Sequence, residues 1–159
     1  MLFRSKVYEA VAPWTEELTF PLRCQHHLRE RAGDAFMQME VLEGPPNADT
    51  TVELLRRLDA DAMGTTWAHY RLTPHTGRKH QLRAQMNALG LPIWGDRIYP
   101  VLQPARPAHE TPDYRSPLQL LARSIEFEDP VSGVRRSFVS SRQLALTVAS
   151  VTSVPSPTT

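Results

Sequence analysis

The sequence predicts an α+β fold, with a mainly antiparallel or mixed sheet and one or two helices. Segments in which polar and apolar residues alternate dominate the chain, and this period of two is typical of half-buried strands. Only Lys79–Leu89 changes clearly to a helical period, and turns rich in proline and glycine separate the segments. With 159 residues, of which 41% are hydrophobic, the chain can form one domain with a buried core.

The first half of the chain contains several strand candidates. Lys6–Ala12 alternates regularly, and Pro13 ends the pattern because proline cannot continue a strand's hydrogen bonding. Thr19–Cys24 and Ala35–Val41 are weaker candidates on either side of a polar segment that we expect to be rich in turns. Gly44–Asn47 has the composition of a loop.

The middle of the chain predicts a β-hairpin. Thr50–Leu58 fits a strand or a helix by pattern alone, whereas Thr65–Leu72 alternates clearly. Asp59–Gly64 has the composition of a connection between them. We therefore expect a hairpin that leads into a glycine turn at Gly77.

The predicted helix over Lys79–Leu89 has an apolar and a polar face. Leu82, Met86 and Leu89 follow the spacing of a stripe that packs on a core. Gly90 is suited to the position after the helix, where a positive φ angle is common. The polar face carries His80, Arg83 and Asn87.

The last third predicts one long loop and one pair of strands. Pro100–Pro117 is rich in proline and is expected to be a surface loop. Leu118–Glu128 and Val134–Ser140 predict paired strands around a short turn. Residues 145–159 lack an amphipathic pattern and are predicted to be a disordered tail, which leaves 1–144 as the domain.

The charge distribution indicates a site for a polyanion. The net charge is only +1, yet no acidic residue occurs from Ala62 to Trp94. At the start of the predicted helix, unpaired N–H groups and the helix dipole favour an anion, and Gly77 permits close approach. Arg78 and Lys79 add positive charge there, which suits a polyanion such as RNA, although a solvated basic helix start is an equally good explanation of these residues alone.

Composition argues against several other classes of protein. The single cysteine, Cys24, excludes an internal disulfide and a zinc site built from cysteines. The six histidines follow no metal-binding spacing, and nucleotide-binding glycine motifs are lacking. No apolar run is long enough to span a bilayer, and the N-terminus lacks the apolar core of a secretory signal, so we expect a cytoplasmic protein without a membrane partner.

Several motifs in one order resemble the RluA-like pseudouridine synthases, which isomerise uridine to pseudouridine in structured RNA. The central match is T-G-R-K-H-Q-L-R at Thr76–Arg83, followed by L-G-L-P-I-W-G-D-R-I-Y at Leu89–Tyr99. Lys6–Ala10 resembles the family's K-x-Y-x-A strand, Ala48–Thr50 its A-x-T segment, and Leu120–Pro130 its closing strand. The similarity extends from about residue 6 to residue 144.

The resemblance implies roles for individual residues. Tyr8 matches the active-site tyrosine that stacks on the target base, and Arg83 matches the arginine that pairs with the catalytic aspartate. Matches to the RNA-facing part of the motif are Arg78, Lys79, His80 and Gln81. His80 fits a structural hydrogen bond equally well, and Gly95-Asp96 matches a loop expected to be structural. The family needs no metal or other cofactor, and the implied partner is ribosomal or transfer RNA.

The family's nucleophile is an aspartate in the motif H-R-L-D-x-x-T-S-G, upstream of K-x-Y, and the sequence has no such motif there. Arg57–Gly64 resembles it superficially, but it follows Tyr8 and lacks the Thr-Ser pair, so Asp59 is expected to be a turn residue in a hairpin. The chain is therefore predicted to be the C-terminal half of a synthase domain, with little or no activity alone.

Three alternatives remain open from the sequence. The chain is a non-catalytic RNA-binding remnant, one piece of a split synthase whose N-terminal chain supplies the aspartate, or the product of a truncated gene model. In each case strands that lack their partners are expected to leave open edges, which favours self-association.

Overall fold

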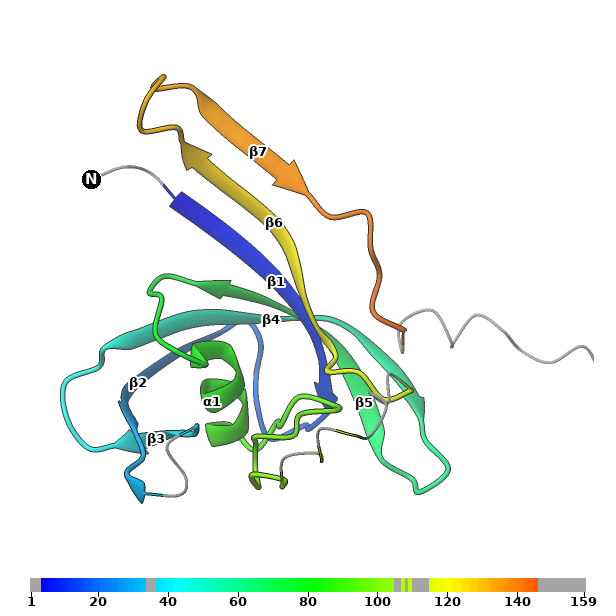
Figure 1. Ribbon diagram of the computed structural model, residues 1–159. Helices are drawn as coiled ribbons and strands as arrows, with labels where there is room; N and C mark the ends of the chain where they lie inside the picture. The colour runs from blue at the N-terminus through cyan, green and yellow to red at the C-terminus, as the bar shows by residue number, and fades with distance from the viewer. Residues whose placement is uncertain (1–3, 34–36, 105–106, 108, 110–114, 146–159) are drawn as a thin grey trace, which may run out of the picture.

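The computed structural model describes residues 4–33, 37–104, 107, 109 and 115–145, which form a seven-stranded sheet and the helix α1 (Figure 1). The strand order is β3-β2-β4-β5-β1-β6-β7, and every neighbouring pair is antiparallel. The elements are β1 Arg4–Pro13, β2 Leu22–Glu30, β3 Met39–Leu42, β4 Ala48–Ala60, β5 Thr66–Pro74, α1 Gln81–Ala88, β6 Leu120–Glu128 and β7 Arg135–Val139. The predicted α+β fold with a mainly antiparallel sheet is confirmed.

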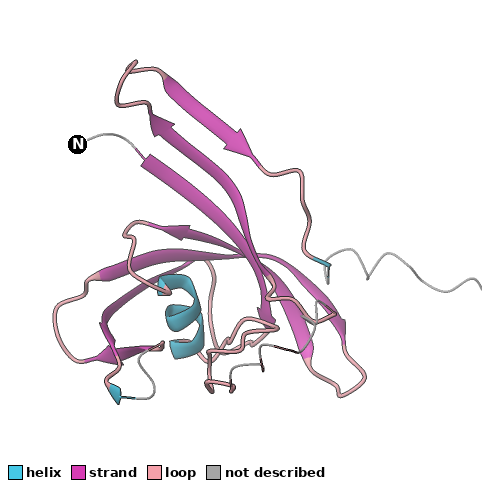
Figure 2. Cartoon of the chain, viewed as in Figure 1, coloured by secondary structure: helices cyan, strands magenta, loops and turns pink. Residues whose placement is uncertain are grey.

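Helix α1 packs on one face of the sheet and covers the main core (Figure 2). Leu82 and Met86, two of the predicted stripe residues, are buried against strand residues such as Tyr70 and Leu72. The third stripe residue, Leu89, is partly buried beside the same cluster. The amphipathic pattern therefore identified the packed face of the helix correctly.

Strand β1 joins two parts of the sheet that diverge from each other. Its residues Tyr8–Pro13 pair with β5, whereas Arg4–Ala10 pair with β6. In Figure 1, β6, β7 and the start of β1 rise away from the sheet formed by β2 to β5. Tyr8 lies where the two parts separate, because it is the first residue of β1 that pairs with β5.

The other face of the sheet carries a smaller apolar cluster. Val11 and Leu58 are buried there with Leu144, from the segment that follows β7. Trp67 and Leu121 pack around them. Residues near 144 are thus part of the folded domain, while the predicted tail beyond Ala145 lies outside the described residues.

Several predicted boundaries need correction. The polar segment after Cys24 was predicted to be turn-rich, and this is wrong, because β2 continues to Glu30. Its backbone pairs first with β4 and then with β3, while only Cys24 and Leu28 are buried. Since β2 lies near the sheet edge and buries only two of its side chains, its sequence lacks the apolar residues of a typical strand.

The β4–β5 hairpin resolves the ambiguity over Thr50–Leu58 in favour of a strand. Asp59 lies within β4 and is exposed, so its assignment to a turn is wrong. Asp61 is the turn residue, and its carboxylate accepts hydrogen bonds from the N–H groups of Met63 and Thr65. No helix among the described residues is long and apolar enough to cross a membrane.

Candidate functional site

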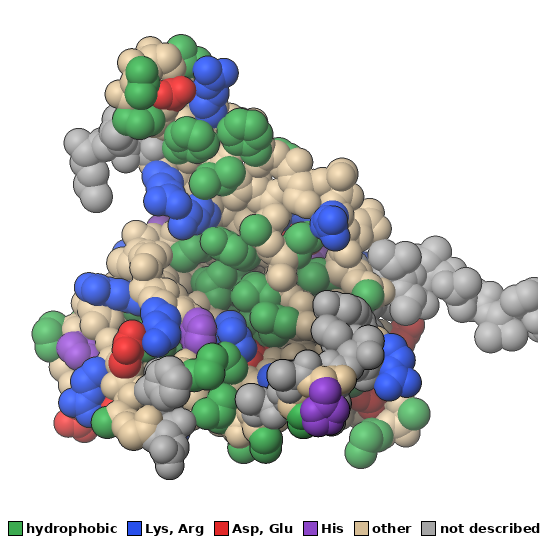
Figure 3. Space-filling view, viewed as in Figure 1, with side chains coloured by type: hydrophobic (Ala, Val, Ile, Leu, Met, Phe, Trp, Pro, Cys, Tyr) green, Lys and Arg blue, Asp and Glu red, His purple; other side chains and the backbone are tan. Residues whose placement is uncertain are grey.

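The start of α1 and the centre of β1 enclose a hollow of about 230 Å³. Strand β1 contributes Lys6 and Tyr8, which lie two residues apart and share one face of the strand. The turn before α1 contributes Thr76–Arg78, and the helix contributes Arg83. In Figure 3, hydrophobic side chains occupy the centre of this face and lysine and arginine side chains lie around them.

A β-bulge in β6 lies opposite Tyr8, which lines the hollow. Val7 pairs with Ser124 and Tyr8 pairs with Ala122, so Arg123 of β6 is the extra residue. Such bulges bend a strand and change the direction of nearby side chains. Tyr8 is half-buried, with part of its side chain packed against the main core and part lining the hollow.

Gln81 lines the hollow but is buried, and its amide makes hydrogen bonds within the protein. Its Oε1 accepts hydrogen bonds from Thr76 Oγ1 (2.7 Å) and the Arg78 N–H (3.0 Å). Its Nε2 donates to Thr50 Oγ1 (2.9 Å) and the Asp49 carbonyl (3.1 Å). Because both ends of this buried amide are occupied, Gln81 fixes the basic turn on β4, while its contact with RNA stays a prediction.

The two cations of the turn differ in their partners. Arg78 Nε donates to the Asn47 carbonyl oxygen at 3.2 Å, and no carboxylate pairs with its guanidinium among the described residues. Lys79 Nζ lies 3.2 Å from a carboxylate oxygen of Glu30 in an exposed ion pair. Arg78 is therefore the stronger candidate for binding an external anion.

Arg83 is held by a carboxylate of this chain. Its Nε donates to Asp96 Oδ2 at 2.8 Å and its Nη2 to Oδ1 at 2.6 Å, a bidentate pair in which the Asp96 side chain is 1% exposed. Burial alone would raise the pKa of Asp96, but hydrogen bonds from Arg83 and from the N–H groups of Ile98 and Tyr99 lower it below its usual range. The expected loop role of Asp96 thus includes orienting Arg83.

His80 occupies an unusual position immediately before α1. Its φ angle of 49° lies in the left-handed region, which few residues other than glycine adopt. Its ring lies 6.1 Å from that of Tyr99, measured between centroids, and its Nδ1 is buried without a hydrogen-bond partner. Burial, Arg83 and Lys79 lower the pKa of His80, so the ring is neutral at pH 7.

The segment Ala62–Trp94, which contains no acidic residue, carries less unpaired positive charge in the structure than its sequence suggests. Three of its cations pair with carboxylates from outside the segment: Arg71 with Glu53, Lys79 with Glu30 and Arg83 with Asp96. The surplus positive charge at the hollow therefore comes from Arg78 together with Lys6, for which the described part of the chain shows no ion pair. Sequence reasoning missed Lys6, although its spacing from Tyr8 placed both on one face.

The described residues contain no group of three or more potential metal ligands. Two histidines outside the hollow make local contacts: His75 Nε2 lies 2.8 Å from Thr51 Oγ1, and His26 Nδ1 lies 3.2 Å from Cys24 Sγ. Burial raises the pKa of the Cys24 thiol to about 12, so it is protonated and a poor nucleophile.

The side chains that line the hollow are suited to bind a planar ring beside Tyr8 and an anion beside Lys6 and Arg78. It cannot supply a carboxylate nucleophile from its own lining, since the described residues that form it include no aspartate or glutamate. Asp59 does not line it. Asp96, whose carboxylate contacts the lining residue Arg83, is already engaged by that ion pair.

Comparison with known proteins identifies relatives of the chain. It is 32% identical over 123 residues to the dual-specificity RNA pseudouridine synthase RluA of Haemophilus influenzae, an alignment that covers 77% of this chain and 48% of the relative. The RluA of Vibrio parahaemolyticus is 30% identical over 136 residues, which cover 86% and 49%. The chain thus spans about half the length of the curated relatives it matches. No family model matches it.

Two solved human structures share the fold. The RNA pseudouridylate synthase domain containing 1 protein superposes with a TM-score of 0.64 and 22% identity, over 87% of this chain and 55% of that one. The domain containing 4 protein gives a TM-score of 0.57 and 22% identity, over 92% and 60%.

Proposed function

Because the chain belongs to the RluA-like pseudouridine synthase family, we propose that its hollow is the uridine site of an RNA pseudouridine synthase and that ribosomal or transfer RNA is the substrate. The observation that carries the proposal is the placement of Tyr8 beside the cations Lys6 and Arg78, which pair with no carboxylate of the described residues, in a hollow whose described lining has no acidic residue. Phosphates of an RNA strand suit the cations, and a uracil ring suits the tyrosine.

In this function the target uridine leaves its stack and enters the hollow, as bases do in enzymes that act on them. Tyr8 stacks on the uracil, while Arg78, Lys79 and His80 face the RNA backbone around it. The Asp96 pair uses Nε and Nη2 of Arg83, which leaves Nη1 for a second carboxylate. That second carboxylate is the nucleophile, and it comes from outside the 159 residues.

The reaction needs no metal or organic cofactor. The nucleophilic carboxylate attacks the nucleoside and the glycosidic bond from C1′ to N1 breaks. A bond from C1′ to C5 then forms, the carboxylate is released, and N1 gains a proton. The C5 hydrogen leaves as a proton. For this chain we therefore propose RNA binding without appreciable turnover, and turnover when a chain with the catalytic aspartate is added. The cytoplasm is the proposed compartment.

RNA binding tests the first part of the proposal. We expect the polypeptide to bind a uridine-containing stem-loop with an affinity that falls steeply with salt. Arg78→Ala should weaken binding and reduce the slope of log K against log salt by about one, because one phosphate contact is lost. Arg29→Ala is the matched control, since it removes the same charge from a pair with Glu40 at the β2–β3 edge. Equal slopes for all three proteins would contradict the proposal.

A non-catalytic RNA-binding protein is the second candidate. The acid-free lining favours it, because binding needs only the cations and Tyr8. RNA binding that persists without tritium release from uridine-5-tritiated RNA, even after an N-terminal half of a relative is added, would favour this candidate over a split synthase.

A further inference from the structure

A second cluster of charged side chains lies on the sheet face opposite the hollow. Glu9, His69 and Arg123 come from the neighbouring strands β1, β5 and β6. Arg123 Nε and Nη2 donate to the two carboxylate oxygens of Glu9 at 2.7 and 2.9 Å, and His69 Nε2 lies 2.9 Å from Glu9 Oε2. The Glu9 side chain is 11% exposed and that of His69 14% exposed.

The cluster is located directly behind the candidate tyrosine. Glu9 follows Tyr8 in the chain, and Arg123 is the extra residue of the bulge opposite Tyr8. On a strand, neighbouring side chains point to opposite faces, so a contact that fixes Glu9 also limits rotation of β1 at Tyr8. The ion pair thus spans the only described irregularity in the β1–β6 ladder.

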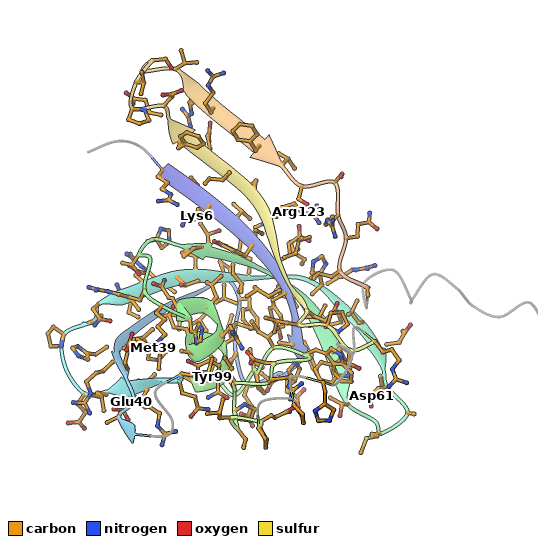
Figure 4. The ribbon with its side chains drawn as sticks, viewed as in Figure 1. Lys6, Met39, Glu40, Asp61, Tyr99 and Arg123 are labelled. Carbon is orange, nitrogen blue, oxygen red and sulfur yellow. The ribbon has the colours of Figure 1, made fainter. Side chains whose placement is uncertain are left out.

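Arg123 also holds the segment that follows β7. Its Nη1 donates to the carbonyl oxygens of Ser140 (2.7 Å) and Arg142 (2.9 Å). Figure 4 shows Arg123 on β6 beside this segment. One guanidinium on β6 therefore connects β1 with the end of the domain through four hydrogen bonds to fixed acceptors.

Burying charges costs free energy, and a buried ion pair is weak evidence for a gain in stability. An apolar pair would fill the same space, as Val11 and Leu121 do on this face. What an apolar pair lacks is direction: a bidentate pair fixes both the distance and the angle between two strands. The bulge needs such a constraint, because it leaves one residue without a partner in the ladder.

We propose that Arg123, through its bidentate pair with Glu9, is a positioning residue that sets the orientation of the Tyr8 ring in the hollow. His69 completes the cluster by holding the second oxygen of Glu9 from β5. The consequence of this positioning for RNA binding and catalysis rests on the proposed function, because it assumes that Tyr8 stacks on the target base. The orientation of Tyr8 in the free protein is independent of that assumption.

Fluorine NMR of the chain labelled with 3-fluorotyrosine measures this orientation directly. The sequence has four tyrosines, and Tyr8→Phe assigns the Tyr8 signal. Arg123→Met removes the charge and the bidentate pair with Glu9 but keeps a long side chain, whereas Arg123→Lys keeps the charge and loses only the bidentate geometry. Arg29→Met, in the exposed pair with Glu40, is the control for loss of one arginine.

We expect Arg123→Met to move or split the Tyr8 signal while the signals of the buried Tyr70 and Tyr99 stay in place, and Arg123→Lys to restore it partly. Affinity for a uridine-containing RNA should fall about tenfold in Arg123→Met, the loss expected when one base loses its stacking partner. Arg29→Met should leave the Tyr8 signal unchanged.

An unchanged Tyr8 signal in folded Arg123→Met would overturn the inference. If that variant does not fold, Glu9→Gln decides instead, because glutamine keeps the shape of the side chain and weakens the pair: a displaced Tyr8 signal supports the inference and an unchanged one refutes it. If wild-type chain binds no RNA, the proposed function fails while the NMR result for Tyr8 still stands.

Discussion

The buried pair of Arg83 and Asp96 allows a quantitative test of how the site is held. In Asp96→Asn, the side-chain oxygen can still accept hydrogen bonds from the N–H groups of Ile98 and Tyr99. That oxygen also keeps the hydrogen bond from Arg83 Nη2, but the new NH₂ group faces the Nε–H of Arg83, whose side chain is only 17% exposed. The substitution therefore leaves a largely buried guanidinium without a counter-charge.

Removing one partner of a buried pair typically costs about 3–5 kcal/mol, out of a total stability of about 5–15 kcal/mol for a domain. At about 2–4 °C for each kcal/mol in a chain of this size, the midpoint of thermal unfolding should fall by roughly 6–20 °C. Urea unfolding followed by the fluorescence of the three tryptophans gives the free energy of unfolding directly.

Glu40→Gln is the matched control, because it makes the same chemical change in a pair whose arginine, Arg29, is 64% exposed. Its cost should stay within about 1 kcal/mol. A second check is Arg83→Met with Asp96→Asn, which should be less destabilised than the sum of the single variants. If the free energy of unfolding of Asp96→Asn lies within about 1 kcal/mol of the wild-type value, the idea that Asp96 anchors Arg83 is wrong.

Three further outcomes are expected. Gly95→Ala should destabilise the protein by about 1–3 kcal/mol more than Gly90→Ala, as measured by urea unfolding. Both positions have a positive φ angle, but only at Gly95 would the new Cβ lie 2.5 Å from a backbone oxygen. Equal losses of stability in the two variants would contradict this. The neighbouring guanidinium lowers the pKa of Glu9 below 4.5, and burial lowers that of His69 below 6.5. Each group therefore adds stability at high pH, and this stability is lost as the pH falls from the group's unfolded pKa through its lower folded pKa. The free energy of unfolding should begin to fall near pH 6.5, where His69 starts to bind a proton, and should fall further below pH 4.5 because of Glu9. A free energy of unfolding that stays constant from pH 7 to 4 would refute these shifts. Strand β7, at the sheet edge, exposes all of its residues, so apparent mass on a sizing column should rise with concentration, and a strict monomer would speak against an open edge.

Local patterns were sufficient to predict the elements that bury one face. The stripe of α1 identified its buried side, since burial imposes a period of about 3.6 on helices. The alternation of Lys6–Ala12 predicted the strand correctly but not its burial on both faces, because Glu9–Ala12 are all buried. The same reasoning failed for the second half of β2, because an exposed strand near the sheet edge has no apolar period to detect.

The candidate site was predicted in part. The resemblance identified Tyr8, Arg78 and Arg83, and all three line one hollow. The pairing of Arg83 with Asp96 and the buried position of Gln81 depend on contacts between distant segments. Neither a motif nor the charge of a segment predicts such contacts. For this reason the sequence did not show that three cations of Ala62–Trp94 pair with carboxylates from other parts of the chain.

Release of tritium from uridine-5-tritiated RNA tests the central claim most directly. The reaction is measured with the 159-residue polypeptide alone and after addition of the N-terminal half of the Haemophilus influenzae relative. We expect no release by the polypeptide alone, release by the mixture, and loss of that release in Tyr8→Ala, which removes the stacking ring. Release at an ordinary enzymatic rate by the polypeptide alone would contradict it, because the hollow's described lining has no carboxylate to act as the nucleophile.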